Sequence, residues 1–219
     1  TAGLTGAVCV IFLKMPVLDA LLLGATLSST DAASVFSVLR SKKLGLRENT
    51  ASLLEMESGS NDPFAYMLTV ISLSVISGQA GIAALAWVTV KQLTLGILCG
   101  VMIVLLVRLF LKYYRFSVPG FDMVFFVGIA LLSYALPTAV GGNGYLSAYI
   151  VGIVLGNSHI PEKKALVHFF DGFTSLMQML IFFLLGLLAT PSHIPQILIP
   201  AIVIALLLTF VVRPLAVVV

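Results

Sequence analysis

The stretch AALAWVTVKQLTLGILCGVMIVLLVRLFL, residues 83–111, is almost continuously apolar and contains two charged residues, Lys91 and Arg108. A helix rises about 1.5 Å per residue, so about 20 apolar residues cross the hydrocarbon core of a bilayer. This stretch is longer than that and therefore predicts a transmembrane helix.

The rest of the chain has the same character. Hydrophobic residues make up 60% of the 219 residues and charged residues 10%, whereas a soluble domain has about 25% charged residues. The mean hydropathy is +1.14. Cys9 and Cys99 both lie in apolar segments, which favours neither a disulfide nor a metal site. The net charge of +3 comes from bases scattered between apolar runs, which argues against a nucleic-acid-binding face. The composition predicts an all-α polytopic membrane protein.

Breaks rich in glycine and proline divide the chain into apolar segments that we predict as spans, with no soluble domain between them. They lie near residues 1–13, 17–39, 50–77, 83–111, 121–137, 144–157, 168–189 and 196–219. The segment 144–157 is short and rich in glycine, so we expect it to lie among other helices. The first and last segments read as helix interior, so we expect a fragment of a longer chain.

The loops between these segments alternate in charge. Loops 40–48, 112–119 and 158–167 are basic, whereas the intervening loops contain one lysine, Lys14. Basic loops stay on the cytoplasmic side of a membrane. We therefore predict that these three loops are cytoplasmic; Lys91 is the base that fits this topology poorly.

Two aspartates fall inside predicted spans. Asp31 lies about 21 Å below the outer end of its span and Asp62 about 18 Å above the inner end of the next, at 1.5 Å per residue. Both depths are near the midplane, where a carboxylate costs several kcal/mol and is therefore a functional candidate. Two carboxylates at one depth on neighbouring antiparallel spans predict a buried cation site.

The sequence around these aspartates supports the same site. Residues 27–33, LSSTDAA, contain several small and hydroxylated residues at mid-span, where side chains can compensate for an interrupted helix. In the next span Ser58 and Asp62 share one helical face, and Glu57 and Asn61 share an adjacent one. The side-chain and carbonyl oxygens of such a site suit an alkali cation or a proton.

Arg213 is a third charge inside a predicted span. By the same rise it lies about 26 Å below the outer end of its span, and Glu57 lies about 10 Å above the inner end. Both positions are in the cytoplasmic half. Because either charge alone would be uncompensated, we predict a structural ion pair between Glu57 and Arg213.

Four motifs resemble the NhaP-type monovalent cation/proton antiporters, and within them the bacterial potassium/proton, or cell-volume-regulation, branch. They are GATLSSTDAASVF at 24–36, LEMESGSNDP at 54–63, GYLSAYIVGIVLGN at 144–157 and FVVRPLAV at 210–217. The resemblance implies two inverted repeats whose broken helices cross at mid-membrane. The second broken helix is not in these 219 residues, so we expect an incomplete transport path.

The resemblance also implies roles for individual residues. Thr30 and Asp31 mark the unwound helix, Asp62 with Ser58 binds cation or proton, and Glu57 pairs with Arg213. The order Asn61-Asp62 resembles the electroneutral subgroup. The implied activity is exchange of Na+ or K+ for H+ in pH homeostasis by a homodimer in the bacterial plasma membrane, with no cofactor and no catalytic residue.

Two alternatives belong to other classes. An intramembrane aspartyl protease uses two membrane aspartates, but its Gly-x-Gly-Asp motif occurs neither at Asp31 nor at Asp62. A cation channel is expected to show a carbonyl filter or rings of charge, and the sequence contains no such pattern. Both remain alternatives to antiport.

Overall fold

The computed structural model describes residues 1–30, 50–78, 81–114, 120–160 and 162–218, and within these ranges it contains helices and no strand. The helices are α1 (Ala2–Leu13), α2 (Val17–Thr26), α4 (Thr50–Ile76), α5 (Ile82–Tyr113), α6 (Phe121–Ala139), α7 (Gly144–Gly156), α8 (Lys163–Leu188), η1 (Pro191–His193), α9 (Ile194–Leu207), η2 (Leu208–Val212) and α10 (Arg213–Val218). The predicted all-α class is confirmed.

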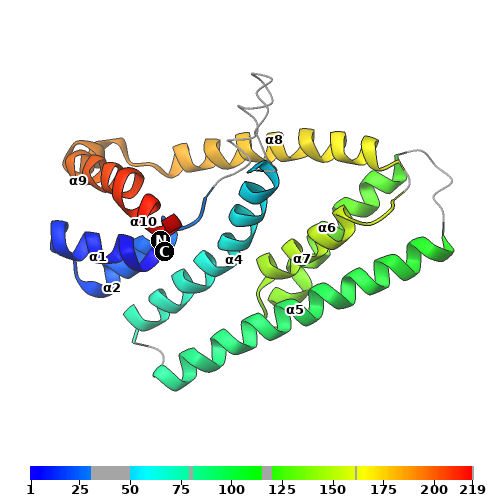
Figure 1. Ribbon diagram of the computed structural model, residues 1–219, viewed down its shortest axis with the longest axis horizontal. Helices are drawn as coiled ribbons and strands as arrows, with labels where there is room; N and C mark the ends of the chain where they lie inside the picture. Colours follow the sequence, from blue (N-terminus) through cyan, green and yellow to red (C-terminus); the bar gives the residue numbers. More distant parts are fainter. Residues whose placement is uncertain (31–49, 79–80, 115–119, 161, 219) are drawn as a thin grey trace.

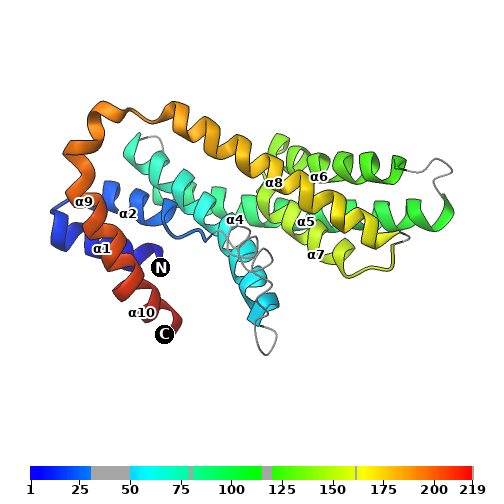
Figure 2. The ribbon, with the colours of Figure 1, turned by 90° about the horizontal axis from the view of Figure 1, so that it is seen from above.

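The helices form two groups connected by α4 (Figure 1). Helices α5, α6 and α7 pack on one another, while α1 and α2 pack on each other and α1 also contacts α9 and η2. Helix α4 contacts α2 from the second group and α7 from the first. In both views α8 runs from the α5–α7 group towards α9 (Figure 2).

Four of the described helices are long and apolar enough to cross a membrane. They are Ala83–Tyr113, Phe121–Ala139, Lys163–Leu188 and Ile194–Val217. Helix α4 has 27 residues, which is long enough, but it carries the polar run ESGSND at 57–62. The described chain is thus an all-α polytopic domain with one polar helix among apolar ones.

Small residues allow close approach of neighbouring helices. A Cβ atom on Gly24 of α2 would lie 2.3 Å from the carbonyl oxygen of Ala2 in α1. A Cβ on Gly96 of α5 would lie 2.8 Å from the carbonyl oxygen of Asn143, which precedes α7. Crossings of this kind are typical of helix packing in membranes, where van der Waals contact drives association.

The ends of α5 and α7 lie together at one end of the first group. There Arg108 of α5 donates a hydrogen bond of 2.8 Å to the hydroxyl of Ser158, just beyond α7. The buried side chains around them come from α5, α6, α7, α8 and the segment before α8: Ile103, Val104, Val107, Phe126, Val151, Leu155, Ile160 and Leu166. The described parts of loops 112–119 and 158–167 therefore lie at the same end of this group of helices. Loop 40–48 lies outside the described residues.

The last predicted span, 196–219, is not a regular α-helix. Residues 208–212 form a π-helical turn, and the amide of Arg213 donates to the carbonyl of Leu208. Pro214 follows immediately; a proline has no amide hydrogen to donate and crowds the carbonyl four residues earlier, which favours local widening of the helix. Such turns are frequent at functional sites.

Candidate functional site

The candidate site begins where α2 ends. The hydroxyl of Thr26 donates to the carbonyl of Leu23 at 2.9 Å, and the hydroxyl of Ser28 donates to that of Ala25 at 2.7 Å. Such bonds satisfy carbonyls of the last helical turn and compete with continuation of the helix. Residues 29 and 30 have no regular secondary structure. Helix α2 thus ends at Thr26, inside the predicted segment 17–39. Asp31 and the residues of the segment after it lie outside the described residues, so the interruption of this segment remains a prediction.

Side chains of α4 hold the main chain of Thr30. Its amide donates to Oδ1 of Asn61 at 3.4 Å, and its carbonyl accepts a hydrogen bond from the hydroxyl of Ser58. Non-helical backbone at membrane depth requires partners of this kind, because hydrocarbon supplies none. Ser58 and Asn61 therefore stabilise the non-helical residue Thr30 beyond the end of α2.

The two carboxylates of α4 face the same segment. One oxygen of Glu57 accepts from the hydroxyl of Thr30 at 3.1 Å, and the other accepts from Nδ2 of Asn61 at 3.0 Å. The same Nδ2 donates to the hydroxyl oxygen of Thr30 at 2.6 Å. Asp62 accepts from the hydroxyl of Ser29. Carboxylate, amide, hydroxyl and main-chain oxygens therefore lie close together where residues 29 and 30 contact α4.

The four α4 residues lie on one stripe of the helix. Glu57, Ser58, Asn61 and Asp62 are positions i, i+1, i+4 and i+5, which lie side by side on a helical surface. Ser58 is buried, whereas Glu57 and Asp62 are exposed in this chain. The sequence predicts that Asp62 is buried, but in the structure its side chain is exposed. Helices α2, α5 and α7 contact α4, and they do not cover the carboxylates of Glu57 and Asp62.

Glu57 has partners other than the predicted one. Its two oxygens accept from Thr30 and Asn61, while Arg213 is half-buried at the start of α10. Arg213 directly follows the π-turn η2, which contacts α1. The ion pair between Glu57 and Arg213 remains a prediction.

Asn143 is a functional candidate that the sequence reasoning missed. It is fully buried, and its Oδ1 caps α7 by accepting from the amide of Leu146 at 3.0 Å. Its Nδ2 donates to the carbonyl of Pro63 at 3.1 Å, and its amide donates to the carbonyl of Gln92 at 3.0 Å. Asn143 therefore joins α7 to α5 and to the residue next to Asp62. The available signal was an asparagine, a preferred N-cap residue, among the glycines of GGNG before an apolar helix.

Tyr149 of α7 supports α4 at a second point. Its hydroxyl donates to the carbonyl of Met56 at 3.1 Å. Its ring lies so close to Gly59 that a Cβ there would be 2.4 Å from a ring carbon. A glycine between Ser58 and Ser60 thus lets α7 approach the site helix.

The donor set suits a hard cation. Within the described residues there is no group of three or more His, Cys, Asp and Glu side chains that resembles a metal site. Oxygen ligands of the kind contributed by Glu57, Asp62, Asn61 and the carbonyl of Thr30 suit alkali cations and protons. The residue types that surround Thr30 are therefore compatible with an alkali cation or a proton as ligand.

Comparison with known proteins gives matches over the whole chain. A family described as the sodium/hydrogen exchanger, transmembrane, matches residues 1–219. The K(+)/H(+) antiporter NhaP of Alkalimonas amylolytica is 39% identical over 99% of this chain, and the K(+)/H(+) antiporter NhaP2 of Shewanella oneidensis is 34% identical over 99%. The Na(+)/H(+) antiporter 1 of Methanocaldococcus jannaschii is 29% identical over 90% of the chain.

The matches cover only part of each relative. The chain spans 38% of the length of the Alkalimonas and Shewanella proteins and 47% of the Methanocaldococcus protein.

Proposed function

The chain belongs to the sodium/hydrogen exchanger family of transmembrane proteins, and from this membership we propose that the protein exchanges a monovalent cation for H+ by secondary active antiport. The observation that carries the proposal is the contact of α4 with the residues just beyond the end of α2, where Asp62 accepts a hydrogen bond from Ser29 and Glu57 accepts one from Thr30. Broken helices that cross at mid-membrane are the usual location of a transported ion.

The cation is Na+ or K+. The similar proteins from Alkalimonas and Shewanella are named K(+)/H(+) antiporters, and that from Methanocaldococcus is named a Na(+)/H(+) antiporter. Both ions take oxygen ligands, so the residue types of the site suit either.

Asp62 is the proposed carrier of both substrates. Its ionised carboxylate binds the cation with help from the oxygens of Asn61, Ser58 and Thr30; Asp31 belongs to the same proposed site. A proton on Asp62 removes the negative charge, so proton and cation compete and cation binding weakens as pH falls. One carboxylate that holds either one proton or one monovalent cation makes the exchange electroneutral.

We also propose an oligomeric state, a membrane and an orientation for the protein. The protein works as a homodimer in the bacterial plasma membrane, with loops 40–48, 112–119 and 158–167 in the cytoplasm, and contributes to pH homeostasis. Glu57 and Arg213 form a structural ion pair.

The test is cation-dependent proton efflux from proteoliposomes that contain the full-length protein, with Li+, Na+ and K+ tested in turn. Asp62→Asn is expected to reduce efflux to the level of empty liposomes, because an amide neither titrates nor carries charge. Asp19→Asn is the matched control, since Asp19 is an exposed aspartate in the first turn of α2. Wild-type exchange by Asp62→Asn would remove Asp62 from the centre of the mechanism.

A further inference from the structure

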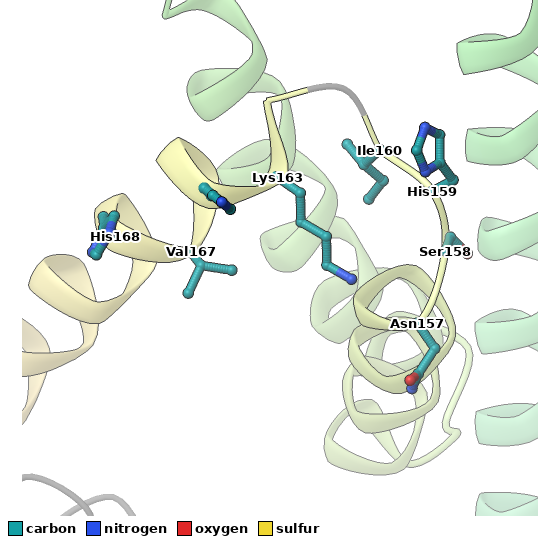
Figure 3. Close-up of a pocket in the computed structure, with 8 residues that line it drawn as sticks. Asn157, Ser158, His159, Ile160, Lys163, Val167 and His168 are labelled. Atoms are coloured by element: carbon teal, nitrogen blue, oxygen red, sulfur yellow. The ribbon is translucent and has the colours of Figure 1, made fainter. Parts of the chain in front are cut away.

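A second polar region lies where α7 ends and α8 begins. A cavity of about 640 Å³ opens there, and its polar lining includes Ser158, His159, Lys163, Lys164 and His168. We refer to it as the basic cavity. In Figure 3 the side chain of Lys163 extends from the first turn of α8 towards the end of α7, where Asn157 lies.

The groups around the basic cavity favour an anion. Lys163 and Lys164 begin α8, and the side chain of Glu162, at the N-cap, makes no capping hydrogen bond. The first amides of the helix and its positive dipole end therefore add to the two ammonium groups, of which that of Lys163 also donates to the carbonyl of Gly156. Arg108 lies beside the cavity through its hydrogen bond to Ser158. Glu162 is the acidic residue adjacent to Lys163, so bases outnumber acids at this point.

An apolar cavity of about 340 Å³ adjoins the basic cavity. Its lining includes Phe126 and Ile129 of α6, Val151 and Leu155 of α7, and Leu166 and Phe170 of α8. The two cavities share Ile160, Lys163 and Val167, so they lie next to each other. Asp171 also lines the apolar cavity, eight residues beyond Lys163 and thus about 12 Å further along α8.

We propose that the two cavities together bind one anionic phospholipid. Its phosphate lies among Lys163, Lys164 and the first amides of α8, and one acyl chain lies between α6, α7 and α8. Charge complementarity explains the headgroup, and the adjoining apolar cavity explains why the ligand is a lipid and not a free phosphate. The predicted orientation agrees, because anionic lipids are concentrated in the cytoplasmic leaflet, and basic pockets between helices on that side bind their headgroups.

Native mass spectrometry of the full-length protein in neutral detergent tests the headgroup. The wild-type protein is expected to retain phosphatidylglycerol in preference to phosphatidylcholine. Lys164→Gln is expected to weaken phosphatidylglycerol retention about fivefold, the factor that corresponds to about 1 kcal/mol for one base near the surface. Lys112→Gln is the control, since Lys112 belongs to the predicted cytoplasmic side and lines neither cavity.

Gly152→Leu tests the acyl chain. Gly152 lines the apolar cavity, and a Cβ built on it meets no atom within 4 Å. The leucine is expected to fill the cavity and reduce lipid retention without lowering the melting temperature. Loss of retention with an unchanged melting temperature supports the proposal, and unchanged retention contradicts it.

Lipid retention by the wild-type protein tests the proposal without any variant. Equal retention of the two lipids would overturn it. So would displacement of phosphatidylglycerol by inorganic phosphate at millimolar concentration, because that result would indicate a simple anion site.

Discussion

Thr30 contributes three groups to the candidate site: its amide donates to Asn61, its carbonyl accepts from Ser58, and its hydroxyl donates to Glu57 while accepting from Asn61. Three side chains of α4 thus hold this one residue beyond the end of α2. Its hydroxyl connects two of them, so the geometry of the site depends on this group.

Thr30→Val keeps the shape of the side chain and removes the hydroxyl. It deprives both Glu57 and Asn61 of a hydrogen-bond partner, so we expect a loss of about 1–3 kcal/mol of stability together with slower exchange. Thr30→Ser retains the hydroxyl and is the matched control. Melting in detergent and proton efflux from liposomes measure the two effects, and equal behaviour of the Val and Ser variants would contradict the role assigned to the hydroxyl.

Glu57 has two candidate partners, Arg213 and Asn61. Two double-mutant cycles test these partners. The first combines Glu57→Gln with Arg213→Met, because the sequence predicts an ion pair between these residues. The second combines Glu57→Gln with Asn61→Ala, because Asn61 donates a hydrogen bond of 3.0 Å to Glu57. If Glu57 pairs with Arg213, removing one partner leaves the other charge uncompensated and lowers stability, and the double variant recovers part of this loss.

We expect coupling in the Glu57–Asn61 cycle, because the two side chains share a hydrogen bond. Coupling in the Glu57–Arg213 cycle is the test of the structural pair, with melting temperature in detergent as the measurement. Additive losses at Glu57 and Arg213 would show that they are not partners.

At the scale of the helices, Asn143 sets how α7 meets its neighbours. It caps α7 and bonds to carbonyls beside Asp62 and within α5. Asn143→Ala removes the cap and leaves the carbonyl of Pro63 without this donor, so we expect a loss of about 1–3 kcal/mol and impaired exchange.

Asn157→Ala is the control for Asn143→Ala. Asn157 stands at the other end of α7, is exposed, and donates to Ile153 four residues earlier. A surface change of this kind is expected to alter stability by less than about 0.5 kcal/mol. Melting temperatures of the two full-length variants give the comparison, and equal values would show that Asn143 is not a structural junction.

At the scale of the whole molecule, the predicted topology can be tested by cysteine accessibility. In a background with Cys9 and Cys99 replaced by Ala, Lys112→Cys and Lys164→Cys are expected to react with a membrane-impermeant thiol reagent only from the cytoplasmic side. Thr190→Cys, in the loop after α8, is expected to react only from the opposite side. Labelling of Lys112→Cys and Lys164→Cys from different sides would contradict the orientation.

The sequence by itself determined the features that depend on short stretches of chain. Hydropathy predicted the all-α class because burial in lipid requires long apolar helices. Small and hydroxylated residues within 27–33 predicted an interrupted helix, and α2 ends at Thr26, just before them. The spacing of Glu57, Ser58, Asn61 and Asp62 predicted neighbouring faces from the helical period alone. Hydropathy does not give the ends of a helix. The apolar segment was predicted near 168–189, whereas helix α8 begins at Lys163. Backbone hydrogen bonds extend a helix whether or not its first side chains are apolar.

Only the tertiary structure decided which residues meet. The partners of Thr30 lie 27 to 31 positions away, and those of Asn143 lie as far as 80 positions away. Such contacts depend on how helices cross, which is set by packing at Gly24, Gly59 and Gly96 and not by any local pattern. The junction of the basic and apolar cavities has the same origin, because α6, α7 and α8 must pack before their lining residues share a space.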